Sequence, residues 1–147
     1  MRYRWGGRWL GPALLVLTGF LLACRVSGVT PTPTRPAVGV ISGRLCYPSE
    51  GIPPMTIYAR HVETQQTFSL AVPANTPEYQ LQVPPGNYYL FAWTEEGTGG
   101  SYSYFVPCGL SVDCPDHRPI PVPVQAGETV RGIDICDFYD PESVPKP

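Results

Sequence analysis

Five cysteines are the residues of this chain whose type and spacing most clearly predict chemistry. The first, Cys24, directly follows an apolar run that ends in Leu21, Leu22 and Ala23. A small residue at the end of a short apolar run is typical of a secretory cleavage site. The segment before Cys24 therefore decides how this cysteine is interpreted.

Residues 1–23 have the composition of a secretory leader. Arg2, Arg4 and Arg8 come before an apolar stretch, residues 10–22, and no acidic residue lies among them. The stretch is too short for a bilayer, which takes roughly 20 residues to span, and Gly and Pro interrupt it. It lacks the arginine pair of a twin-arginine signal, so we predict general secretion.

Residues 21–24 resemble the lipobox of bacterial lipoproteins, in which a leucine, a variable residue and a small residue precede a lipidated cysteine. The resemblance implies that Cys24 takes up a diacylglyceryl group as a thioether and becomes the new N-terminus. Two or more acyl chains, at roughly 0.8 kcal/mol per buried methylene, hold a protein stably at a membrane. We expect a palmitate-bearing lipoprotein of the cell membrane, on its extracytoplasmic side. The alternative is an ordinary signal peptide with an unmodified cysteine.

The composition divides the chain into four segments. After the signal peptide, residues 1–23, we expect a Pro- and Thr-rich linker at 24–37, a globular domain at 38–140 and a Pro-rich tail at 141–147. The formal net charge of −2 becomes more negative once the arginine-bearing leader is removed. No basic patch is left to indicate a nucleic-acid partner.

The globular segment has the pattern of an all-β domain. The 19 prolines and 15 glycines of the chain separate short runs of Val, Ile, Tyr and Phe, and no run keeps a helical period. Short strands at this spacing are typical of a single β-sandwich with seven or eight strands. The expected strands are residues 39–46, 55–62, 67–72, 78–83, 88–94, 101–106, 120–124 and 130–135.

Three stretches resemble a known family. They are "GVISGRLCYPSEGIPPMTIYARHVETQQTFSLAV", "YQLQVPPGNYYLFAW" and "VPVQAGETVRGIDI", and they are similar to the carboxypeptidase regulatory-like, transthyretin-like domains. The resemblance implies a prealbumin-like sandwich that serves as a non-catalytic accessory or interaction module, and it names no ligand. The insertion "PCGLSVDCPDHRP" departs from the family pattern.

An even set of cysteines in an exported domain predicts disulfides. Cys108 and Cys114 enclose five residues that include Gly109, so we expect them to pair locally. Cys46 and Cys136 then remain for each other. A zinc site built from the four thiols is the alternative, but the chain has no CxxC pair and export favours oxidation.

The faces of the terminal strands agree with the longer disulfide. Alternation places Ile41 and Leu45 on one side of the first strand, with Arg44 and Cys46 on the other. By the same rule Asp134 and Cys136 lie opposite Ile133 and Ile135 in the last strand. A bridge between the outer faces would join the two ends of the domain.

Catalytic and metal-binding patterns are weak. The two histidines, His61 and His117, lie in no HExxH arrangement, and the chain contains no GxSxG. Asp116 beside His117 is more typical of a solvated turn than of a catalytic dyad. A calcium site would draw on Asp134, Asp137 and Asp140, but these lack the glycine-centred loop and the glutamate of an EF-hand. We expect no enzyme activity, no cofactor and no metal.

One aromatic row is the strongest candidate for a binding site. In "NYYLFAWT" alternation separates Tyr89, Phe91 and Trp93 from the opposite face, and nearby Tyr102 and Tyr104 share a side. If the smaller set of Tyr88, Leu90 and Ala92 forms the core, the row could stack on sugar rings or on a protein partner. Alternatively, the insertion loop covers the row, and its role is structural.

These observations together predict a non-catalytic, lipid-anchored β-sandwich that acts as a binding or structural module of the bacterial cell envelope. A carbohydrate-binding module with an aromatic platform is the first alternative. A small envelope hydrolase is the second, and it would require polar groups that converge on a pocket.

Overall fold

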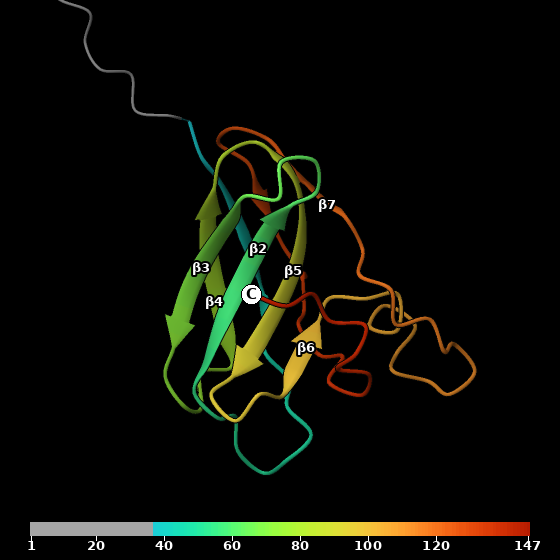
Figure 1. Ribbon diagram of the computed structural model, residues 1–147. Coiled ribbons are helices and arrows are strands. Elements are labelled where there is room, and N and C mark those ends of the chain that lie inside the picture. The colour runs from blue at the N-terminus through green and yellow to red at the C-terminus, as the bar shows by residue number, and fades with distance from the viewer. Residues whose placement is uncertain (1–36) are drawn as a thin grey trace, which may run out of the picture. The chain divides into compact units, whose positions relative to one another are not determined.

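The computed structural model describes residues 37–147, which form two β-sheets and contain no helix (Figure 1). The first sheet comprises β1 (Gly39–Arg44), β4 (Glu78–Val83) and β8 (Thr129–Val130). The second comprises β2 (Met55–His61), β3 (Thr67–Val72), β5 (Gly86–Thr94), β6 (Gly99–Ser101) and β7 (Val122–Val124). The strand order is β4-β1-β8 in the first sheet and β3-β2-β5-β6 in the second, with β7 also paired to β5.

The predicted leader, Cys24 and nearly all of the predicted linker lie outside the described residues. Within residues 37–147, no helix is present that could span a membrane. The described part of the chain is therefore all-β, as the sequence predicts.

Regular alternation along the central strands sets the faces of both sheets. β1 is antiparallel to β4, with Ile41 opposite Leu81, and parallel to β8. β2 is antiparallel to β5, with Ile57 opposite Ala92. Successive residues of a strand point to opposite faces of the sheet. The side chains of these paired residues therefore lie on the face that carries the other buried apolar residues of each strand.

Both sheets contribute to one hydrophobic core. Ile41 and Val83 of the first sheet and Ile57 and Leu90 of the second are all fully buried in the same cluster. The predicted inner set of β5, which is Tyr88, Leu90 and Ala92, belongs to this cluster, so the prediction of its faces is confirmed. The opposite face of β5 must therefore meet something other than the core.

Two predicted strands differ most in extent from the observed ones. The strand expected at 101–106 ends at Ser101, because the main chain turns where the Val106 N–H donates to the Ser103 carbonyl at 3.1 Å. The strand expected at 130–135 ends at Val130, since Gly132 has a φ of 74° that an extended strand does not allow. Ile135 rejoins the first sheet only by an isolated bridge to Leu45.

Candidate functional site

The outer face of β2 and β5 gathers the aromatic side chains that the sequence singled out. β5 places Tyr89, Phe91 and Trp93 on the face opposite the core, and β2 places Tyr58 directly across from Phe91. The Tyr58 and Phe91 rings stack with centroids 5.3 Å apart. The Arg60 guanidinium lies 5.2 Å from the Phe91 ring centroid.

This row is not an open platform. Phe91 is completely buried, while Tyr89 and Trp93 are half-buried. The alternative prediction, a cover supplied by the loop around Cys108 and Cys114, also differs from the structure. The segment that lies on the face is the C-terminal segment, residues 144–147, which Figure 1 shows ending in front of β2 and β5.

Trp93 is the main point of contact between the face and the C-terminal segment. Its indole N–H donates to the Pro145 carbonyl at 2.8 Å, and the Lys146 ammonium lies 3.9 Å from its ring centroid. Gly99 of β6 pairs with Trp93, and a Cβ atom at Gly99 would lie only 2.7 Å from the indole. A side chain at Gly99 would thus displace the ring.

Two further contacts hold the C-terminal segment. The Arg60 guanidinium donates to the Lys146 carbonyl, and Val144 is buried with 3% of its surface exposed. The sequence predicted residues 141–147 to be a Pro-rich tail, and in the structure the last four of these residues contact the second sheet. Proline content indicated an extended segment but carried no information about a partner surface.

A groove continues along the sheet beside the C-terminal segment. It has a volume of about 610 Å³, which is within the range of small-ligand sites. Its walls include Thr56, Tyr58, Trp93, Thr94, Glu95 and Pro147. It thus combines aromatic walls with one exposed carboxylate.

Tyr102 and Tyr104 do not join this face. Tyr102 packs against the core, where burial and then the negative charge of Asp134 raise the pKa of its phenol. Tyr104 is 43% exposed, and the Arg118 guanidinium lies 5.7 Å from its ring centroid. The predicted strand that put them beside the row ends at Ser101, which explains the difference.

The four described cysteines form the two disulfides expected from the sequence. Cys108 and Cys114 close a local loop with a Cα–Cα distance of 6.3 Å. Cys46 and Cys136, 90 positions apart, have a Cα–Cα distance of 4.5 Å. No group of three or more His, Cys, Asp or Glu side chains in residues 37–147 is placed to hold a metal ion.

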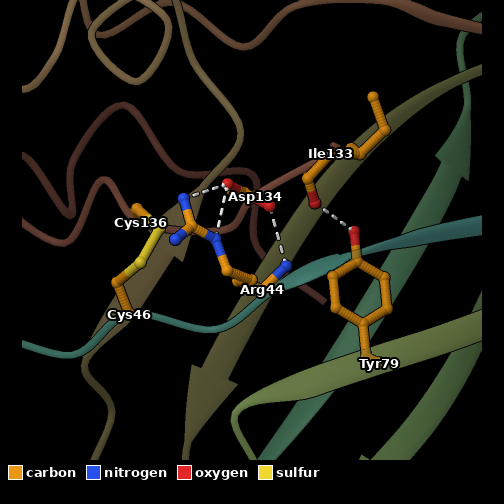
Figure 2. The surroundings of a disulfide bond; sticks show 6 residues. All are labelled: Arg44, Cys46, Tyr79, Ile133, Asp134 and Cys136. Carbon is orange, nitrogen blue, oxygen red and sulfur yellow. Dashed lines mark hydrogen bonds and ion pairs between the residues drawn. A yellow bond between two sulfur atoms is a disulfide. The ribbon is translucent and has the colours of Figure 1, made fainter. Parts of the chain in front are cut away.

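Figure 2 shows two further links that accompany the long disulfide. Arg44 and Asp134 form an ion pair at 2.8 Å, and the Arg44 backbone N–H donates to the same carboxylate at 2.8 Å. The Tyr79 hydroxyl donates to the Ile133 carbonyl at 2.7 Å. Together these contacts join the end of β1 and β4 to the segment that follows β8.

We call these contacts the clasp: the Cys46–Cys136 disulfide, the Arg44–Asp134 ion pair and the hydrogen bond from Tyr79 to Ile133. Burial and the charge of Arg44 set the pKa values of its ionisable groups. Burial raises the pKa of the Asp134 carboxyl, but the hydrogen bonds and charge of Arg44 outweigh it, so the pKa is lowered overall. Burial raises the pKa of the Tyr79 phenol well above its usual range. A hollow of about 510 Å³ beside the clasp is lined by side chains of both charges, including Arg131 and Glu78.

A buried polar cluster joins His117 of the insertion to Ser103 and Asp137, and it was not found from the sequence. Asp137, only 1% exposed, accepts from the Ser103 hydroxyl at 2.5 Å and lies 2.9 Å from Nδ1 of His117. The Phe105 ring packs on the imidazole at 4.5 Å. Since Ser103 is buried and bonded to the carboxylate instead of the imidazole, the cluster does not have the order of a nucleophilic triad.

Asp116 does not pair with the neighbouring His117. Its carboxylate accepts from the Arg118 guanidinium at 2.7 Å, and these hydrogen bonds lower the pKa of Asp116 to about 2. No pattern in the sequence indicated that His117 pairs with Asp137, which is 20 positions away, instead of with the adjacent Asp116.

The chain matches no protein-family model, and the searches of curated proteins and of solved structures found no match either.

Proposed function

We propose that this protein is a non-catalytic, lipid-anchored module of the bacterial cell envelope that binds another envelope component. The single observation that carries the location is the pairing of all four described cysteines into disulfides. Disulfides persist outside the reducing cytoplasm. Cys24 is the one cysteine outside the described residues, and it directly follows the predicted leader.

The finer fold in this proposal is a transthyretin-like, prealbumin-like β-sandwich related to the carboxypeptidase regulatory-like domains. Two observations support it. The two sheets share one core, and the first strand, β1, lies at the centre of its sheet between β4 and β8. A non-catalytic interaction module is what the resemblance implies, and the function itself has to be argued from a site.

A binding role is supported by the groove on the second sheet. Beside this groove, Trp93 and Arg60 already hold the backbone carbonyls of Pro145 and Lys146. A carbohydrate platform has less support, because stacking of a sugar requires a free aromatic face and Lys146 lies over Trp93. The buried position of Ser103 likewise gives a hydrolase no accessible nucleophile in this cluster.

The experiment that tests the proposal is metabolic labelling with palmitate in a bacterial host, followed by membrane fractionation. We expect the wild-type chain to carry the label and to fractionate with membranes. Cys24→Ser should lose both, because a hydroxyl does not replace the thiol as lipid acceptor. The double variant Cys108→Ser, Cys114→Ser is the matched control and should keep the label. Label that persists in Cys24→Ser would overturn the anchor.

A further inference from the structure

The C-terminal segment, residues 144–147, is held on the sheet by contacts that a different peptide could make equally well. The hydrogen bonds from Trp93 and Arg60 go to the backbone carbonyls of Pro145 and Lys146. Backbone carbonyls are present in every peptide, so these two donors recognise an extended main chain and no particular side chain. Proline favours this conformation, because it fixes φ and leaves the backbone without internal hydrogen bonds.

Two side chains of the C-terminal segment, those of Lys146 and Pro147, lie at the Trp93 ring or at the groove beside it. The Lys146 ammonium lies over the Trp93 ring at 3.9 Å, a distance at which a cation is attracted by the ring face. Pro147 forms part of the groove wall together with Tyr58 and Trp93. Grooves lined by aromatic side chains are a recurrent means of binding proline-rich peptides. On the face around Trp93, the side-chain features in contact are therefore the Lys146 cation over the indole and the neighbouring Pro147 at the edge of the groove.

The groove is larger than the part that residues 145–147 fill. About 610 Å³ remains beside Pro147, and Glu95 at its edge is exposed and offers a carboxylate to a second basic group. A longer peptide of the same type would make the present contacts and additional ones.

The contacts also divide the C-terminal segment into a fixed part and an exchangeable part. Val144 is buried, with 3% of its surface exposed, whereas Lys146 and Pro147 are exposed. Residues 145–147 can therefore leave the groove while Val144 keeps the chain in place. A tethered segment of this kind competes with a free peptide at a high effective concentration.

We propose that the groove beside Trp93 is a binding site for an extended, proline-containing peptide of another polypeptide, with Lys or Arg directly before a proline, and that residues 145–147 are its built-in competitor. The inference rests on the proposed function of a binding module and names the ligand of that module. It does not depend on lipid attachment.

The test uses the full chain in detergent and the fluorescein-labelled pentapeptide Ser-Val-Pro-Lys-Pro, with binding followed by fluorescence anisotropy. Lys146→Glu replaces the cation over the indole face by an anion, which the ring face repels, and should release residues 145–147 from the face around Trp93. We expect the peptide to bind Lys146→Glu at least tenfold more tightly than wild type. Lys146→Arg keeps the cation and is the matched control, with affinity close to wild type.

Two control peptides test the recognition itself. Ser-Val-Ala-Lys-Ala lacks the prolines and Ser-Val-Pro-Glu-Pro lacks the cation, and each should bind Lys146→Glu at least tenfold more weakly than the parent peptide. Equal binding of all three peptides would overturn the proposal. So would a fall in melting temperature for Lys146→Glu without peptide binding, because the C-terminal segment would then be only a structural strap. Self-association of Lys146→Glu in place of peptide binding would identify a second copy as the occupant and would also overturn it.

A second measurement covers the case in which Lys146→Glu does not fold. Excess parent peptide added to wild-type protein should shift the Trp93 indole resonance in a saturable way. Absence of that shift at millimolar peptide would contradict the proposal. Loss of palmitate labelling with intact peptide binding would overturn only the anchor, so the two failures are distinguishable.

Discussion

The indole N–H of Trp93 donates to the backbone carbonyl of Pro145 at 2.8 Å, which joins the fifth strand to a residue 52 positions later. Strand alternation alone would leave this aromatic face open. The hydrogen bond places the C-terminal segment on it. Its consequence is that the same tryptophan supports the fold and recognises a peptide. Substitutions on the two sides of the bond should therefore have different effects.

Trp93→Ala should destabilise the domain. It removes a half-buried ring that packs on Gly99 and leaves the Pro145 carbonyl without its donor. We expect a loss of about 3 kcal/mol, at the low end of the range for truncation of buried aromatics, and a fall in Tm of roughly 10 °C or more. Tyr104→Ala, at a 43% exposed tyrosine, is the control in the same thermal melt. An unchanged Tm for Trp93→Ala would mean that the ring is not packed as described.

Tyr79→Phe tests the clasp at the end of β1. The hydroxyl of this buried tyrosine is the donor to the Ile133 carbonyl, and its removal leaves a buried carbonyl unsatisfied. The free energy of unfolding in urea should fall by about 1 to 2 kcal/mol. Tyr139→Phe, at a tyrosine that is 59% exposed, is the matched control and should stay within about 0.5 kcal/mol of wild type. Equal values for the two variants would contradict the buried hydrogen bond.

The two disulfides should contribute unequally to the free energy of unfolding. The Cys46–Cys136 bridge closes a loop of 90 residues and the Cys108–Cys114 bridge a loop of 6. The chain-entropy model then assigns about 4 to 5 kcal/mol to the long bridge and about 2 kcal/mol to the short one. We expect denaturant midpoints to fall further for the double variant Cys46→Ala, Cys136→Ala than for Cys108→Ala, Cys114→Ala. The reverse order would contradict a stabilisation set by loop length in the unfolded chain for the bridge drawn in Figure 2.

The Arg44–Asp134 pair predicts a loss of stability in acid. Although burial alone would raise the pKa of Asp134, Arg44 lowers it below the value of about 3.9 expected in the unfolded chain. The stabilisation is therefore fully present above the unfolded pKa and is lost as the pH falls through the folded pKa. Thermal melts of wild type and Asp134→Asn should differ more at pH 6 than at pH 2.5.

Asp113→Asn, at an exposed aspartate of the insertion loop, is the control for this pH series. Its melts should follow those of wild type at both pH values. If the difference in Tm between wild type and Asp134→Asn is the same at pH 6 and pH 2.5, the ion pair does not have the stabilising role given to it.

The strands were predictable where local alternation and turn residues agree. Residues 67–72 and 78–83 alternate in burial and are bounded by prolines and asparagine, and the observed strands have the same bounds. The strand at 130–135 was not predictable in extent, because Gly132 adopts a positive φ that the sequence permits but does not require.

The site was predictable only in part. Period-two alternation placed Phe91 and Trp93 on one face of β5, and the same rule placed Arg44 and Asp134 beside the Cys46–Cys136 bridge. The cover over Trp93 comes from residues 52 positions away, and the pairing of His117 with Asp137 spans 20 positions. Contacts of this kind depend on how loops return to the sheet, and no local pattern encodes them.

The central claim is that the outer face of β2 and β5 is a groove occupied by the chain's own C-terminal segment. Hydrogen exchange of the Trp93 indole N–H, followed by NMR in the full chain, tests it most directly. Trp5 and Trp9 are the other two tryptophans, so loss of one signal in Trp93→Phe assigns the resonance. The wild-type indole should exchange slowly and the Lys146→Glu indole faster. Exchange in wild type as rapid as that of a free tryptophan side chain would contradict the occupied groove.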